Sequence, residues 1–192
     1  PVTAAQILWI NLVTAITLGV ALAFEPTEVG TMRRKPRSRN APLLDRALAW
    51  HIVLVSLLFM AGVFGMYASA IDRGYSVDLA RTIAVNTLVV MEIFHLFFIR
   101  NIYGTSLTWK AVRGTAIVWL TVVTVTILQF AFTYLAFMQS IFDTEPVPFE
   151  YGLIIVGIGV ALFVVLECEK QIRLRLSSEY TAQRRVSREA SA

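Results

Sequence analysis

The chain has 192 residues, of which 57% are hydrophobic and 16% are charged, and its formal net charge is +4. A soluble domain is about 45–50% apolar and about 25% charged, so the composition argues against an ordinary soluble protein. The basic residues flank long apolar runs, which indicates membrane topology rather than nucleic-acid binding.

The ends and the cysteine content add two expectations. The chain begins at Pro1 inside an apolar segment and has no basic leader with a cleavage site, so we expect a fragment without a signal peptide. Cys168 is the only cysteine, which excludes an internal disulfide and a cysteine metal cluster.

Long apolar segments follow one another along the chain, each close to the roughly 20 residues that cross a hydrocarbon core about 30 Å thick. Backbone groups in lipid must hydrogen-bond within their own segment, so we expect helices. Buried helices of a soluble protein would each need a charged face, which these segments lack. The sequence therefore predicts an all-α polytopic membrane bundle of five transmembrane helices within residues 1–176, at residues 4–24, 48–71, 82–99, 115–138 and 151–168.

Lys and Arg are unevenly distributed among the connections. They are abundant after the first, third and fifth spans and scarce in the two other connections, which the positive-inside rule places outside. We therefore expect the amino terminus outside the cell membrane and the carboxyl terminus in the cytoplasm. Residues 177–192 are small and polar, which favours a disordered cytoplasmic tail. The basic residues of the first, third and fifth connections are Arg33, Arg34, Lys35, Arg37, Arg39, Arg46, Arg100, Lys110, Arg113, Lys170, Arg173, Arg175, Arg184, Arg185 and Arg188.

Polar groups interrupt the first span. Asn11 and Thr14 lie three residues apart in the run QILWINLVT, so a regular helix would present them on one face. Small residues repeat at a spacing of four in later spans, which predicts close helix packing. They are Ala61, Gly65 and Ser69 in the second span, and Gly157 and Ala161 in the fifth.

Glu92 lies near the middle of the third span, where a charge costs about 2.5–3.5 kcal/mol on insertion scales. It is either functional or a protonated acid that bonds neighbouring helices. His95 follows three residues later, as a proton partner or as a cap on a polar seam near the inner interface. Asn86 lies about 120° away around the helix, so we expect it to bond a neighbouring helix.

Both polar spans cross the membrane in the same direction, and at 1.5 Å per residue Asn11, Thr14 and Glu92 fall within roughly 5 Å of the same depth. An amide, a hydroxyl and a carboxylate at one level could replace part of the water shell of a hard cation. The alternative is interhelical hydrogen bonding, worth about 0.6 kcal/mol for each bond. The residues alone leave both interpretations open.

Other polar residues favour structural roles. Gln129 is a lone amide in the fourth span and predicts an interhelical hydrogen bond. His51 is expected at an interface, facing water or headgroups. Glu167, Glu169 and Lys170 lie at the inner end of the fifth span and predict a solvated rim.

The run QILWINLVT resembles the sixth membrane helix of P-type cation-transporting ATPases, which in calcium pumps reads approximately Q-L-L-W-V-N-L-V-T-D-G-L-P-A. FEP and MRRKPR resemble the loop after that helix, RTIAVNTLVVMEIFHLFFIRN the eighth helix, and FTYLAFMQSIFDTEPV the end of the ninth. The resemblance covers about residues 1–175 and implies helices six to ten of such a pump.

The resemblance implies that Asn11, Thr14 and Glu92 coordinate the transported cation. One departure matters: Ala15, Ile16 and Leu18 stand where the calcium-pump pattern has Asp, Gly and Pro. Fewer carboxylates favour an ion of lower charge, so we expect Na⁺, K⁺ or H⁺, or at most one divalent ion.

The sequence lacks the phosphorylated motif D-K-T-G-T and a nucleotide-binding loop. The resemblance implies that the pump's upstream membrane and cytoplasmic domains bind ATP and Mg²⁺, so this chain alone has no catalytic residue. One alternative is a stand-alone five-helix protein, such as a channel subunit or scaffold. Another is a proton-coupled transporter using Glu92 and His95, although no inverted repeat is found.

Overall fold

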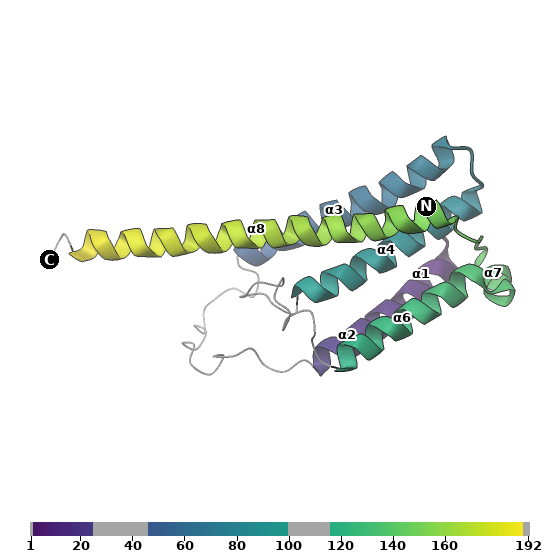
Figure 1. Ribbon diagram of the computed structural model, residues 1–192, viewed down its shortest axis with the longest axis horizontal. Helices are drawn as coiled ribbons and strands as arrows, with labels where there is room; N and C mark the ends of the chain where they lie inside the picture. The colour runs from purple at the N-terminus through teal and green to yellow at the C-terminus, as the bar shows by residue number, and fades with distance from the viewer. Residues whose placement is uncertain (1, 25–45, 100–115, 190–192) are drawn as a thin grey trace.

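The computed structural model describes residues 2–24, 46–99 and 116–189, apart from the side chains of residues 15–18, 47, 174 and 176–189. Every regular element in these ranges is a helix, which confirms the all-α prediction. In chain order the elements are α1 (Ala4–Ile10), the π-helical η1 (Asn11–Ala15), α2 (Ile16–Ala23), α3 (Arg46–Asp72), α4 (Val77–Ile99), α6 (Ala116–Tyr134), α7 (Ala136–Phe142) and α8 (Phe149–Glu189) (Figure 1).

Five segments of the described chain are long and apolar enough to cross a membrane, as predicted. They are Ala4–Ala23, Leu48–Asp72, Val77–Ile99, Ala116–Tyr134 and Phe149–Arg173. The third begins five residues before the predicted boundary, because the Ser76 hydroxyl accepts a hydrogen bond from the amide of Leu79 at 3.0 Å and satisfies a free donor of the first turn.

The fourth span ends at Tyr134 instead of residue 138. Leu135 is extended (φ −81°, ψ 124°) and separates α6 from the short helix α7. The side-chain amide of Gln139 donates to the carbonyl oxygen of Thr133 at 2.8 Å, which satisfies a backbone acceptor at the break.

Helix α8 continues past the end of the candidate membrane span to Glu189, and the disordered cytoplasmic tail at residues 177–192 stays a prediction. Residues 177–189 contain neither proline nor glycine and include several good helix formers, so nothing in the local sequence stops the helix. The boundary of the membrane domain at residue 176 stays a prediction.

Helix α4 lies between two groups of helices (Figure 1). On one side it packs against α3 and α8 through Ile83, Ala84 and Met91. On the other side Val85 and Val89 pack against the first span and α6. Half of the apolar part of α4 is buried, a larger share than in any of the other four candidate spans. A polar residue on α4 therefore meets protein on several sides.

Among the described glycines, Gly159 and Gly62 are the most tightly packed against other helices. A Cβ atom on Gly159 would lie 2.3 Å from Cδ2 of Phe94, and one on Gly62 would lie 2.7 Å from Sδ of Met91. Gly65 and Gly157 have no described atom within 4 Å of that position, so close packing was wrongly predicted at these two glycines. The packed faces of α3 and α8 are rotated away from them.

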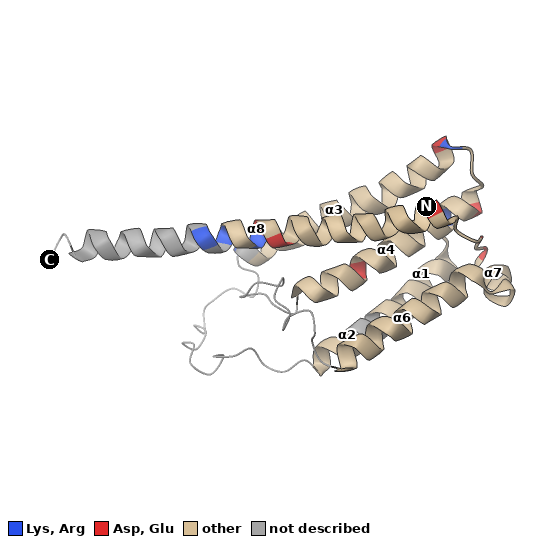
Figure 2. Cartoon of the chain, viewed as in Figure 1, with Lys and Arg blue, Asp and Glu red and all other residues tan. Residues whose placement is uncertain are grey.

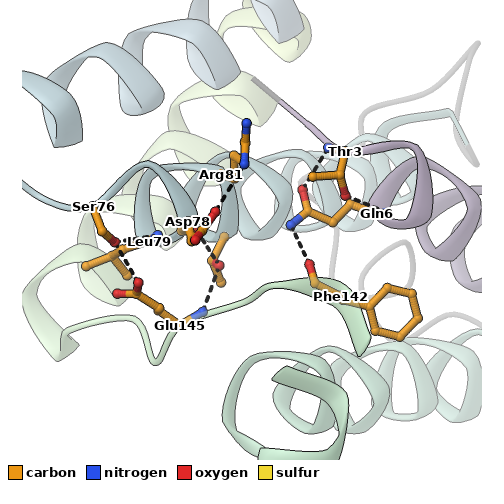
Figure 3. Close-up of polar contacts among 9 residues, drawn as sticks. Thr3, Gln6, Ser76, Asp78, Leu79, Arg81, Phe142 and Glu145 are labelled. Atoms are coloured by element: carbon orange, nitrogen blue, oxygen red, sulfur yellow. Dashed lines mark hydrogen bonds and ion pairs between the residues drawn. The ribbon is translucent and has the colours of Figure 1, made fainter. Parts of the chain in front are cut away.

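Polar contacts join the helices at the end of the bundle near Thr3 (Figure 3). Thr3 and Gln6 form a capping box, and the fully buried Gln6 amide donates to the carbonyl oxygen of Phe142 at 2.9 Å. The Ser76 hydroxyl donates to Oε1 of Glu145 at 2.8 Å. These bonds fix the start of the first span and the start of α4 against the segment around α7.

Charged residues lie mainly near the helix ends, and α4 carries one acid, Glu92, in its middle (Figure 2). The basic connections at 25–45 and 100–115, on which the predicted orientation rests, lie outside the described residues. The direction in which the bundle crosses the membrane therefore stays a prediction.

Candidate functional site

The first span changes helical geometry at its polar residues. Residues Asn11–Ala15 form a π-helix between α1 and α2. Short π segments interrupt the regular backbone bonding and are frequent at functional sites. The Thr14 hydroxyl donates to the carbonyl oxygen of Ile10 at 2.6 Å, which provides that carbonyl with a donor at the interruption.

The structure brings the predicted site residues of two spans together. Asn11 and Thr14 from η1 and Glu92 and His95 from α4 line one cavity of about 250 Å³. The cavity is completed by Gly19, Leu22, Leu96 and Ile99. Thr14 is buried, Glu92 and His95 are half-buried, and Asn11 is exposed. The residues that we expected at one depth therefore line one cavity, and their depth in the membrane stays a prediction.

Thr14 and Glu92 bring two oxygen-bearing side chains to the wall of the same cavity. The Thr14 hydroxyl donates its proton to the carbonyl oxygen of Ile10, which leaves its oxygen lone pairs to accept a hydrogen bond or to coordinate a cation. The Glu92 carboxyl group can do the same with either of its oxygens. The arrangement therefore suits a bound cation or a protonated acid.

Unsatisfied polar atoms mark the same region. Oε2 of Glu92 and Nε2 of His95 are buried without a hydrogen-bond partner among the described residues. An unpaired buried polar group costs about 1–3 kcal/mol, and more when it is charged. Something outside the described chain, such as an ion, a proton or water, is needed to satisfy them.

His51 is half-buried and stacks on two rings of α4, and the prediction that it faces water or headgroups stays untested. Its ring lies 5.8 Å from that of His95 and 5.2 Å from that of Phe98, measured between centroids. Phe59 contacts His95 edge-on at 5.9 Å. His95 therefore lies between the cavity and an aromatic cluster that links α3 to α4. No spacing in the sequence indicated that two histidines from different spans would meet.

Asn86 and Gln129 form a polar network of their own, as predicted. The Asn86 amide donates to the Thr133 hydroxyl at 3.0 Å, and the Gln129 amide donates to the Asn86 oxygen at 3.3 Å. The indole of Trp9 donates to Gln129 Oε1 at 3.4 Å. These bonds connect α4, α6 and α1 and hold the first span in register two residues before Asn11.

The predicted solvated rim on α8 was wrong for two of its three residues. Lys170 is fully buried and pairs with Glu167, 3% exposed, at 2.7 Å between Nζ and Oε2. Lys170 Nζ also lies 4.7 Å from the ring centroid of Phe98 on α4. The spacing Glu-x-x-Lys could have indicated the ion pair, but its burial depends on α4, which the sequence of α8 does not specify.

A helical bundle with a polar, partly unsatisfied cavity beside a π-helical turn is typical of a membrane transporter. The sequence model for the C-terminus of cation transporting ATPases matches residues 1–172. The chain belongs to this family, as the resemblance of its first and third spans predicted. It is accordingly an integral membrane protein that corresponds to the C-terminal membrane region of these ATPases.

Curated relatives agree with this assignment. The chain is 40% identical over 167 residues to the probable cation-transporting ATPase F of Mycobacterium tuberculosis, covering 86% of this chain and 18% of that protein. It is 33% identical over 156 residues to the cation-transporting ATPase pma1 of Synechocystis (78% and 17%). It is 29% identical over 129 residues to the human plasma membrane calcium-transporting ATPase 1 (61% and 10%). The chain thus spans under a fifth of the length of these relatives.

Proposed function

We propose that the chain supplies cation ligands and structural support within an ATP-driven pump, with Asn11, Thr14 and Glu92 as ligands. The observation that carries the proposal is that Asn11, Thr14 and Glu92 line one cavity, with Oε2 of Glu92 buried and without a hydrogen-bond partner among the described residues. A cation in the cavity would supply the partner that this oxygen lacks. His95, on the same wall, is placed to exchange a proton with the site.

The transported ion in this proposal is monovalent, namely Na⁺, K⁺ or H⁺. The cavity contains one carboxylate, from Glu92, and two neutral oxygen donors. Calcium takes 6–8 oxygen ligands and several anionic ones in typical sites. One relative is named a calcium-transporting ATPase. Transport of a single Ca²⁺ would need further acids from outside this chain.

The proposal assigns ATP and Mg²⁺ to parts of the full-length protein outside this chain. We also propose that the pump lies in the cell membrane, with the amino terminus of this chain outside and its carboxyl terminus in the cytoplasm. This orientation rests on the basic connections of the sequence.

The test is ion-stimulated ATP hydrolysis by the full-length protein that contains this chain, reconstituted in vesicles. Na⁺, K⁺ and Ca²⁺ are titrated separately at several pH values, and ion uptake is counted for each ATP hydrolysed. Saturable stimulation by a monovalent ion or by protons supports the proposal. Stimulation only by Ca²⁺, with two ions carried in each cycle, contradicts it.

A further inference from the structure

An apolar groove of about 640 Å³ lies between α3 and α8, away from the cation cavity. Trp50 of α3 forms one wall. The other wall is formed by two adjacent rows of α8 residues at a spacing of four, Val164, Cys168 and Ile172 beside Val165, Glu169 and Arg173. Along the helix axis the rows extend for about 14 Å, the length of the upper part of a lipid acyl chain.

The two parts of the groove differ in chemistry. Val164, Val165, Ile172 and Trp50 are 43–59% exposed and form an apolar surface. Glu169 and Arg173 lie within α8, at the end of its apolar span Phe149–Arg173. Trp side chains are enriched at the level of lipid headgroups, which places this end of the groove at the membrane surface.

Glu169 and Arg173 contact each other but leave hydrogen-bonding capacity unused. Nε of Arg173 lies 3.3 Å from Oε1 of Glu169, and the two side chains are 35% and 17% exposed. Nε of Arg173 and Oε2 of Glu169 are both buried without a hydrogen-bond partner among the described residues. At the mouth of the groove, Arg173 therefore offers a cationic hydrogen-bond donor and Glu169 offers an anionic acceptor.

The nearby charged groups leave this pair accessible. Lys170 is buried on a different face of α8, against Glu167 and Phe98. His51 of α3 lies near enough to feel the charges of both Glu169 and Arg173.

We propose that this groove binds a phospholipid with a primary ammonium headgroup, phosphatidylethanolamine. Its phosphate accepts from the partly exposed guanidinium group of Arg173, its ammonium donates to the Glu169 carboxylate, and one acyl chain lies along the Val164 row. A choline headgroup has no N–H to donate to Glu169. A glycerol headgroup leaves the lipid with a net negative charge and offers Glu169 only neutral hydroxyl donors.

The experiment is native mass spectrometry of the full-length protein, delipidated in detergent and incubated with dioleoyl phosphatidylethanolamine, phosphatidylcholine or phosphatidylglycerol. The variants are Glu169→Gln, which removes the charge, and Val164→Trp, which fills the groove. Val160→Trp is the control, because Val160 is 45% exposed on the same helix and outside the groove. A thermal unfolding midpoint close to that of the wild type establishes that each variant is folded.

We expect the wild type and Val160→Trp to retain phosphatidylethanolamine in preference to the other lipids. Glu169→Gln should lower its affinity about tenfold, as expected for loss of a charged hydrogen bond, and Val164→Trp should abolish retention. Equal retention of phosphatidylcholine, or equal retention by the two tryptophan variants, would overturn the proposal. So would a lack of lipid binding because another segment of the pump fills the groove.

Discussion

Thr14 of η1 and Glu92 of α4 line the same cavity, and Oε2 of Glu92 is buried without a hydrogen-bond partner among the described residues. Ordinary packing between membrane helices pairs a buried donor with a buried acceptor. Here the Thr14 hydroxyl donates to the carbonyl oxygen of Ile10 in its own helix, and the acid of the facing helix keeps an unused acceptor. This relationship favours a ligand site over a simple interhelical hydrogen bond.

Replacing Thr14 with Val should weaken cation binding while leaving the fold intact. Valine has nearly the same volume as threonine but lacks the hydroxyl oxygen that serves as a ligand. The ion concentration for half-maximal ATPase stimulation should therefore rise about tenfold. Thr14→Ser keeps the oxygen and should stay near the wild-type value. Thr124→Val is the matched control, because the half-buried Thr124 donates its hydroxyl to Leu120 of its own helix and lies outside the cavity. An unchanged ion requirement in Thr14→Val would argue that Thr14 serves packing alone.

Introducing the missing acid should change ion selectivity. Ala15→Asp restores the residue that follows this threonine in the calcium-pump pattern and adds a second carboxylate to the ligand helix. The apparent affinity for Ca²⁺ relative to that for monovalent ions should then increase, by at least about tenfold. Ala15→Asn, similar in size and uncharged, is the control. An equal response of both variants in ion-stimulated ATPase assays would contradict the assignment of selectivity to charge.

Helix packing around α4 predicts opposite outcomes for two glycines of α8. Gly159→Ala places a methyl group 2.3 Å from the Phe94 ring, which must move, so we expect a loss of about 1–3 kcal/mol in the free energy of unfolding. Gly157→Ala meets no described atom within 4 Å and should be neutral or slightly stabilising. Denaturant titration in mixed micelles measures both values. Equal destabilisation by the two substitutions would show that α8 packs with a different face.

The buried ion pair of α8 should respond strongly to loss of one partner. Lys170→Met leaves the Glu167 carboxylate buried without its cation and should cost about 3–5 kcal/mol. Adding Glu167→Gln to this variant should recover much of the loss, because no unpaired charge remains. The exposed pair Asp78–Arg81 has the same spacing, so Arg81→Ala should cost less than about 1 kcal/mol. A double variant no more stable than Lys170→Met would contradict this explanation.

Much of the fold follows from the sequence, because long apolar runs in lipid have few alternatives to helices. That Asn11, Thr14 and Glu92 line one cavity also follows, since the fixed rise of a helix predicts them at one level. The π-helix did not follow, because nothing in the residue types from Asn11 to Ala15 distinguishes it from a regular helix.

Contacts between distant spans were the hardest to predict. The meeting of His51 with His95, and of Lys170 with Phe98, depends on how α3, α4 and α8 are rotated about their axes. The apolar residues surround these helices almost uniformly, so periodicity gave no preferred face. The predicted small-residue motifs failed for the same reason.

The most direct test of the account is the cation dependence of Glu92→Gln in the full-length protein. The substitution keeps the size of the side chain and removes its charge, and Glu150→Gln, at an exposed acid in the first turn of α8, is the control. We predict that Glu92→Gln folds normally and needs about ten- to a hundredfold more ion for half-maximal ATPase stimulation, whereas Glu150→Gln matches the wild type. Normal ion affinity and transport in Glu92→Gln at equal expression would show that Glu92 only joins helices.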